Sequence, residues 1–192
     1  LGARVTTMTG PMTLSPHESW LGRTINALGE PIDGGDALVR GERAFAIQGT
    51  PPSPLRRSRL GTPLITGVKA IDLFTPICAG QRLGIFAGSG VGKSTLLAML
   101  SRAPSCDVTV LALVGERSRE VRDFLDDTLG ETRSRVVSVV STSDESPMMR
   151  RLAPATAMCI AEYYRDRGQN VLLIIDSLTR YAHAMRACAG GG

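Results

Sequence analysis

Residues 87–95 read Ala-Gly-Ser-Gly-Val-Gly-Lys-Ser-Thr and lie between an apolar run, 82–86, and a run of helix formers, 94–100. Glycines at alternate positions allow left-handed backbone angles, so that successive N–H groups point into one anion-binding hollow. Lys93, one of only two lysines in the chain, adds a point charge that suits the β and γ phosphates of a nucleotide. The following helix directs its positive end to the same place. The stretch therefore predicts a strand, a phosphate-binding loop and a helix.

Each loop position has a predicted part in binding ATP and Mg²⁺. Ala87 replaces the first glycine of the strict motif and, being small, still permits the turn. Ser94 offers a hydroxyl to Mg²⁺. The alternative is a glycine-rich turn before an ordinary helix. The predicted nucleotide-binding residues are Ala87, Gly88, Ser89, Gly90, Val91, Gly92, Lys93, Ser94 and Thr95.

Composition sets the outer bounds. With 192 residues, 43% of them hydrophobic, the chain is long enough for one main core. The net charge of +4 does not by itself indicate a nucleic-acid-binding protein. The cysteines are scattered along the chain and form no Cys-x-x-Cys pair, which predicts free thiols in a reducing cytosol and no zinc or disulfide framework. No apolar run reaches membrane-spanning length and no signal peptide opens the chain, so we expect a soluble protein.

The chain divides into two predicted parts. Residues 4–9 alternate like a strand, and turn residues punctuate the sequence up to position 33. We interpret 1–33 as the end of an incomplete N-terminal β-barrel domain and 34–192 as a nucleotide-binding domain truncated at its C-terminal end. The chain begins with Leu1 and ends in glycines, so both ends are expected to be cut from a larger protein.

Strands and helices alternate after the loop. The predicted strands are 108–114, 135–140 and 171–175, and the predicted helices are 119–129, 147–166 and one that begins near Thr179. Apolar strands between amphipathic helices predict an α/β fold with a mainly parallel sheet that helices cover on both faces.

Two carboxylates follow predicted strands. Asp176 directly follows the strand 171–175, a place where an acid can hold Mg²⁺ near the γ-phosphate. Alternatively, Asp176 could cap the next helix. Glu116 follows the strand 108–114 and could accept a proton from water, although charges are common in a first helical turn. Since ligands of open α/β sheets bind beyond the carboxyl ends of the strands, both acids are expected beside the loop.

These motifs resemble those of a known family. The loop, then Gly115-Glu116-Arg117, then the segment 176–180 (Asp-Ser-Leu-Thr-Arg) resemble, in this order, the catalytic subunits of rotary and export ATPases, which have a RecA-like P-loop core. The segments 142–147 and 176–181 most resemble the flagellar protein-export ATPase, with the injectisome type III secretion ATPase second. The resemblance implies that Lys93 and Thr95 contact phosphates and that Ser94 and Asp176 bind Mg²⁺, with Glu120 in the outer shell of the metal. It also implies that Glu116 acts on the attacking water and that Arg117 and Arg180 lie near the γ-phosphate.

The resemblance also implies a function. A subunit of this kind hydrolyses ATP in a homohexamer at the cytoplasmic face of the inner membrane, where it energises protein export. It contacts export apparatus proteins and export substrates, and the membrane only through these partners. Nothing in the chain corresponds to the family's trans-acting arginine finger or adenine platform. Since an arginine finger contributes about 10³–10⁵ in rate, we expect the isolated chain to bind MgATP weakly and to turn it over very slowly.

Two other functions remain open. An RNA-translocating termination helicase shares the core, but it needs stacking aromatic residues, and only 4% of this chain is aromatic, so no nucleic acid is expected. A non-catalytic subunit of a rotary ATPase lacks a carboxylate at the place of Glu116, so that residue favours an enzyme.

Overall fold

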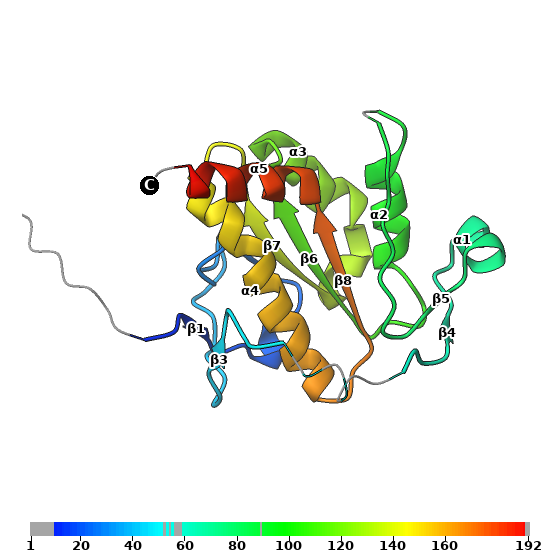
Figure 1. The fold of residues 1–192 in the computed structure, drawn as a ribbon, viewed down its shortest axis with the longest axis horizontal. Helices are drawn as coiled ribbons and strands as arrows, with labels where there is room; N and C mark the ends of the chain where they lie inside the picture. Colours follow the sequence, from blue (N-terminus) through cyan, green and yellow to red (C-terminus); the bar gives the residue numbers. More distant parts are fainter. Residues whose placement is uncertain (1–9, 52, 54, 56–58, 89, 191–192) are drawn as a thin grey trace, which may run out of the picture.

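The computed structural model describes residues 10–51, 53, 55, 59–88 and 90–190 (Figure 1). The strands are β1 (Thr13–Leu14), β2 (Thr24–Ile25), β3 (Phe45–Ala46), β4 (Pro63–Leu64), β5 (Ile77–Cys78), β6 (Val108–Val114), β7 (Val136–Ser141) and β8 (Val171–Asp176). The α-helices are α1 (Lys69–Phe74), α2 (Lys93–Ser101), α3 (Ser118–Asp123), α4 (Pro147–Asp166) and α5 (Leu178–Ala189). Shorter helical turns are η1 (Glu18–Trp20), η3 (Phe124–Thr128) and η4 (Gly130–Arg135).

A parallel sheet in the order β2, β7, β6, β8 forms the centre of the molecule. Every residue of β6 is buried, as expected for a central strand covered on both faces. Near the carboxyl ends of β6 and β8, Leu113 lies opposite Asp176. The strands predicted at 108–114, 135–140 and 171–175 are confirmed to within one residue. The predicted α/β fold with a parallel sheet is therefore confirmed.

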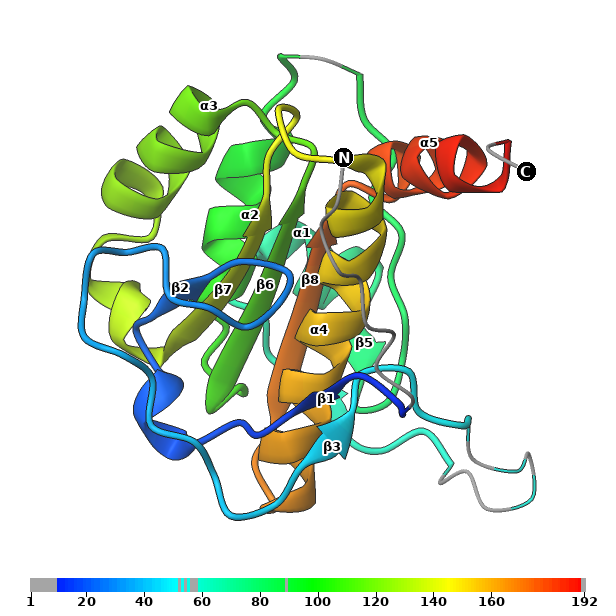
Figure 2. The same ribbon diagram turned by 90° about the vertical axis from the view of Figure 1, so that its left-hand side faces the viewer.

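Helices cover both faces of this sheet, on opposite sides in Figure 2. Val110 and Ala112 of β6 belong to the core on the side of α4, whereas Leu111 and Leu113 belong to the core on the side of α2 and α3. This division follows from the strand geometry, since successive side chains point to opposite faces. The predicted two-sided covering is present.

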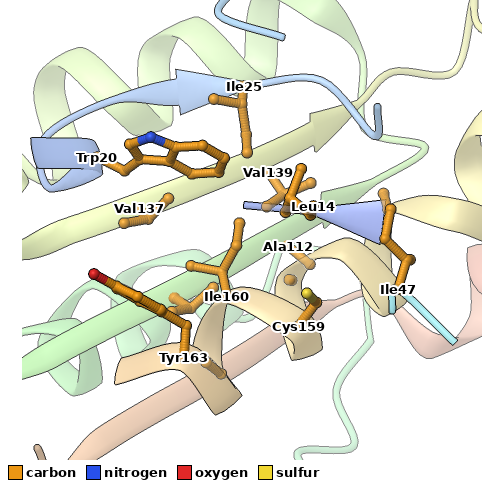
Figure 3. Packing of buried hydrophobic residues seen from close by; sticks show 14 of the residues in the cluster. Leu14, Trp20, Ile25, Ile47, Ala112, Val137, Val139, Cys159, Ile160 and Tyr163 are labelled. Carbon is orange, nitrogen blue, oxygen red and sulfur yellow. The ribbon is translucent and has the colours of Figure 1, made fainter. Parts of the chain in front are cut away.

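Helix α4 begins and ends where the sequence predicts it, at 147 and 166. Ser146 caps its first turn by accepting a hydrogen bond from Met149 N (3.3 Å), and Pro147 occupies the first turn, where the lack of an N–H is harmless. Ile160 and Tyr163 on its inner face pack in one cluster with Trp20 (Figure 3). The long helix thus fixes the N-terminal segment against the sheet.

The N-terminal segment is part of the main core. Its strand β2 pairs in parallel with β7, and Trp20, which is 2% exposed, donates its indole N–H to Val39 O at 2.6 Å. Arg23 makes a two-pronged contact with Asp33, at 2.7 and 2.9 Å. The predicted domain boundary at residue 33 stays a prediction. The predicted strand 4–9 lies outside the described residues.

The helix predicted at 119–129 has a different course. Helix α3 gives way at Phe124 to the π-helical turn η3, in which Leu129 N donates to Phe124 O at 3.1 Å, and then to η4. Both Phe124 and Leu129 are buried against the sheet. The apolar residues therefore occupy the core as predicted, but a regular helix does not carry them there.

The predicted strand at 82–86 is wrong. This stretch has no regular secondary structure, and Phe86 is 98% exposed. A strand needs the edge of another strand for its hydrogen bonds, and none of the strands in the described ranges pairs with these residues. The predicted helix 94–100 is confirmed as α2, and the helix expected near Thr179 is α5.

All four cysteines are free, as predicted: Cys106 and Cys159 are buried, and Cys78 and Cys188 are half-buried. Within the ranges that the structure describes, no helix combines the length and the apolar character needed to cross a membrane.

Candidate nucleotide-binding site

The glycine loop enters α2 through left-handed backbone. Gly90 has a φ of +75°, and Gly92, the residue that precedes the helix, has a φ of +92°. Other residue types adopt such angles at a cost, which explains glycine at both positions. No side chain caps the first turn of α2 among the described residues, so its N–H groups are available to an anion. Ser89 lies outside the described residues.

The loop borders open space. A methyl group added at Gly88, Gly90 or Gly92 would find no atom within 4 Å. Val91 is 67% exposed, and Ala87, Ser94 and Thr95 are exposed as well. These predicted nucleotide-binding residues are therefore accessible to a ligand in solution.

Lys93 and Asp176 form an ion pair. Lys93 occupies the first position of α2 and Asp176 the last position of β8, so the pair joins residues that are far apart in the sequence. Its Nζ contacts Asp176 Oδ1, and the side chain of Asp176 is only 9% exposed. Ser177, not Asp176, caps α5, because its hydroxyl oxygen accepts from Arg180 N at 3.4 Å. The interpretation of Asp176 as a mere helix cap is therefore wrong.

Glu116 and Arg180 form a second ion pair at the same edge of the sheet. Arg180 Nη2 lies 3.0 Å from Glu116 Oε2, and its Nη1 donates to the backbone oxygen of Gly115. Gly115 has a φ of +72°, and a methyl group added there would lie 3.0 Å from Arg180 Cδ and 3.6 Å from Arg150 Cδ. Glycine therefore allows both arginines to approach the turn that carries Glu116.

The electrostatic surroundings of Glu116 connect the two pairs. Burial raises the pKa of Glu116 above its ordinary value, and so do a hydrogen bond with Glu120 and the charge of Asp176, while Arg180 and Lys93 oppose this rise. The net result is a raised pKa, because burial disfavours the charged carboxylate more than the two cations stabilise it. One cluster thus contains Lys93, Glu116, Glu120, Asp176 and Arg180.

Arg117 lies at the solvent side of this cluster. Its side chain is 79% exposed and meets Glu120 at 3.3 Å, on the first turns of α3. Such an exposed pair contributes little to stability. Among the described residues, Glu120 links Arg117 to the rest of the cluster.

The cluster lies at the carboxyl edge of the sheet, toward which the arrowheads of β6, β7 and β8 point in Figure 1. Open α/β sheets bind ligands at this edge. A surface hollow of about 660 Å³ lies instead near the amino ends of the strands, where Glu18, Tyr164 and Arg167 help to line it. None of the predicted site residues lines that hollow, so its size carries no argument for the site.

The donor set fits a nucleotide with Mg²⁺. The loop offers an ammonium group, free N–H groups and the Ser94 hydroxyl, which suit phosphate oxygens. In the ranges described, no group of three or more His, Cys, Asp or Glu side chains is placed to hold a metal ion. Mg²⁺ commonly binds through one or two carboxylates together with waters and substrate phosphates. Asp176 with Ser94 meets that requirement.

Sequence reasoning missed the surroundings of Glu116. It assigned no role to Arg150, whose buried Nε has no hydrogen-bond partner among the described residues, or to the polar residues between β7 and α4. The signal available was the run 141–146, which is polar throughout and follows a buried strand at the same edge as Glu116.

Known proteins share this arrangement of sequence and fold. Residues 67–190 match the nucleotide-binding domain of the ATP synthase alpha/beta family. The chain is 61% identical over 180 residues to the flagellum-specific ATP synthase of Agrobacterium fabrum, an alignment that covers 94% of this chain and 38% of that protein. It is also similar to the solved structure of a prototypical ATPase from the type III secretion system of pathogenic bacteria, with a TM-score of 0.87 and 46% identity, covering 94% of this chain and 53% of the other.

A second solved structure is the assembled ATPase EscN in complex with its central stalk EscO, from the type III secretion system of enteropathogenic E. coli. It gives a TM-score of 0.86 and 46% identity, covering 94% of this chain and 45% of the other. The chain therefore spans less than half of the length of the flagellar relative, at 38%. Since the match over residues 67–190 includes the glycine loop, both ion pairs and Arg117, the chain belongs to the ATP synthase alpha/beta family.

Proposed function

We propose that this chain is the nucleotide-binding part of a longer subunit that hydrolyses ATP to ADP and phosphate and so energises flagellar protein export. The observation that carries the proposal is the cluster at the sheet edge, in which Lys93 meets Asp176 and Arg180 meets Glu116 beside an open glycine loop. These are the charges that a triphosphate, its magnesium ion and an attacking water require.

Each residue of the cluster has a proposed part in the reaction. Lys93 and Thr95 hold phosphate oxygens, together with the N–H groups of the loop. Ser94 and Asp176 hold Mg²⁺, which when bound neutralises charge on the phosphates, and Glu120 supports it from the outer shell. Arg180 and Arg117 lie near the γ-phosphate, Arg180 from within the cluster and Arg117 from its exposed side.

Glu116 is the proposed catalytic residue for water. It lies in the turn after β6, its side chain is 15% exposed, and its raised pKa makes it a better proton acceptor than an ordinary carboxylate. To act, its carboxylate must leave Arg180, whose guanidinium then becomes available to the γ-phosphate. Binding of the nucleotide likewise requires Lys93 to exchange Asp176 for phosphate oxygens.

The assembly and the place of action are proposed from the relatives. EscN was solved as an assembled ATPase with a central stalk, which supports a ring, and we propose a homohexamer. It would work in the cytoplasm at the inner face of the membrane, in contact with export apparatus proteins and export substrates. The higher identity to a flagellar relative, 61% against 46% for the secretion structures, favours flagellar over injectisome export.

The remaining alternatives are less well supported. An RNA-translocating helicase would need stacking aromatics, whereas Trp20 is buried in the core at 2% exposure. A non-catalytic subunit would not need the carboxylate of Glu116.

The test of this function is the ATPase rate of the full-length subunit carrying Glu116→Gln. The glutamine keeps the size of the side chain but does not accept a proton at neutral pH. We expect turnover to fall by about 10²–10⁴-fold while ATP binding stays within a few-fold of the unmodified protein. Glu162→Gln on α4, whose carboxylate faces Arg165 at 3.9 Å away from the site, is the matched control and should keep the full rate. Unchanged turnover in Glu116→Gln would remove this residue from the reaction.

A further inference from the structure

The turn that carries Glu116 has no regular backbone structure of its own. It lies between the end of β6 at Val114 and the start of α3 at Ser118. Beyond the bond from Gly115 N to Ser141 O at the end of the β6–β7 pairing, neither a strand ladder nor a helical turn fixes its backbone. The neighbouring connection between β7 and α4, residues 142–146, runs beside it (Figure 2).

Three hydrogen bonds join this connection and the end of β7 to the turn. Gly115 N donates to Ser141 O at 2.6 Å, and Ser143 N donates to Glu116 O at 2.9 Å. The Ser118 hydroxyl donates to Asp144 Oδ2 at 3.1 Å. The residues before, at and after the catalytic position are thus all held by one short segment.

Glu145 fixes the shape of that segment. Its Oε2 accepts from the hydroxyl of Ser141 at 3.1 Å, and its Oε1 accepts from Thr142 N at 3.3 Å. Its own N–H donates to Thr142 O at 3.2 Å, which closes a turn. Ser141 is fully buried, at 0% exposure, so its hydroxyl needs a hydrogen-bond partner, and Glu145 supplies one.

We propose that Glu145 is a positioning residue for the reaction: it locks the segment 141–146, and this segment holds the backbone of Glu116 in place. The proposal rests on the function proposed above, in which Glu116 acts on water. The hydrogen bonds that Glu145 makes among the described residues go to Ser141 and Thr142, so its effect on Glu116 is transmitted through Ser143 and Asp144. A displacement of about 1 Å in a catalytic group can cost about 10²-fold in rate.

The decisive experiment measures kcat and KM of the full-length subunit with Glu145→Ala and Glu145→Gln, each alone and together with Glu116→Gln. Glu145→Ala should lower kcat by about 10- to 100-fold and change KM by less than about 3-fold, because the nucleotide contacts are untouched. Glu145→Gln should restore kcat to within about 3-fold, since an amide can accept from Thr142 N and donate to the Ser141 hydroxyl. In the Glu116→Gln variant, adding Glu145→Ala should lower kcat by less than about 2-fold further.

A second, milder variant guards against loss of folding. Asp144 is exposed, so Asp144→Ala removes only the bond from Ser118 and should leave the thermal midpoint unchanged while kcat falls by a few-fold. A readout that does not involve catalysis is the amide hydrogen exchange of Ser143, which should speed up at least about 10-fold in Glu145→Ala and stay slow in Glu145→Gln. Glu162→Ala should alter neither measurement.

Several results would overturn the proposal. A normal kcat in Glu145→Ala would do so. So would a fall in kcat on adding Glu145→Ala to Glu116→Gln that is as large as the fall it causes alone, because the effect would then not act through Glu116. Loss of rate in Glu116→Gln with normal rate in Glu145→Ala overturns the positioning role alone. Full rate in Glu116→Gln overturns both the catalytic role and the positioning role.

Discussion

The loss of stability on replacing Gly115 with alanine can be calculated from the contacts around this residue. At this position alanine would meet Arg180 Cδ at 3.0 Å and Arg180 Cβ at 3.1 Å, at a backbone φ of +72°. The left-handed backbone costs about 1–2 kcal/mol for a residue with a side chain, and displacing the packed arginine costs about 1–3 kcal/mol. Loss of freedom in the unfolded chain offsets about 0.4–1 kcal/mol. Gly115→Ala should therefore lower the free energy of unfolding by about 1–4.5 kcal/mol.

A matched glycine separates the two costs. Gly168 has a φ of +83°, but a methyl group added there would meet nothing within 4 Å. Gly168→Ala therefore carries only the backbone cost and should lower the free energy of unfolding by about 0–1.5 kcal/mol.

The assay is urea unfolding of this chain, followed by the fluorescence of its only tryptophan, Trp20, which is 2% exposed when folded. If the two alanine variants lose the same stability to within about 0.5 kcal/mol, the close contact between Arg180 and Gly115 is refuted.

Three further predictions concern the core, a salt bridge and the thiols. Ile160→Ala should lower the free energy of unfolding by about 2–5 kcal/mol in urea titration, because this side chain is 0% exposed, and a cost below about 1 kcal/mol would contradict its place in the core. The hydrogen bond from Arg23 holds the pKa of Asp33 well below its ordinary value, so the pair stabilises the fold above about pH 4 and this contribution fades as the pH falls further. Asp33→Asn should therefore lower the free energy of unfolding by about 1–3 kcal/mol at pH 7 and by progressively less toward pH 2. An equal loss of stability at both pH values would refute this prediction. Burial raises the pKa of the Cys159 thiol to about 11. In a time course of alkylation at pH 8 followed by mass spectrometry, the half-buried Cys78 and Cys188 should react before Cys159, which should react only after unfolding. Equal rates would contradict the burial of Cys159.

The sequence predicted those elements whose signals are local. The run 171–175 is apolar throughout and the run 108–114 is apolar except for Thr109, and both are strands of the central sheet. The helix at 147–166 carries its apolar residues at helical spacing together with a capping serine, and it begins and ends as predicted. In each case the information lies within the segment itself.

The errors arise where the outcome depends on a distant partner. The run 82–86 contains Leu83, Ile85 and Phe86 and so resembles a short strand. Strand formation also needs a neighbouring strand to pair with, and the residues of the run itself do not contain that information. The run 119–129 is predicted as one regular helix, whereas Phe124 and Leu129 reach the core through a wider, π-helical turn. Tertiary contacts override local preference in both cases.

The candidate site shows the same division. The loop residues and the two acids follow from the motif and from strand ends, because the carboxyl edge of a parallel sheet gathers them. The pairing of Arg180 with Glu116 and its contact with Gly115 join residues more than sixty positions apart, so spacing along the chain could not predict them. The hydrogen bonds from 141–146 to the turn of Glu116 are of the same kind.

The most direct test of the account is calorimetric titration of this chain with a non-hydrolysable ATP analogue and Mg²⁺. Lys69, the only other lysine, is exposed at the start of α1 and provides the matched control. We predict that Lys93→Ala weakens binding at least about 10-fold, that Lys69→Ala binds like the unmodified chain, and that Asp176→Asn loses most of the dependence of binding on Mg²⁺. Equal affinity of Lys93→Ala and Lys69→Ala would contradict the central claim that the glycine loop and its lysine bind the triphosphate.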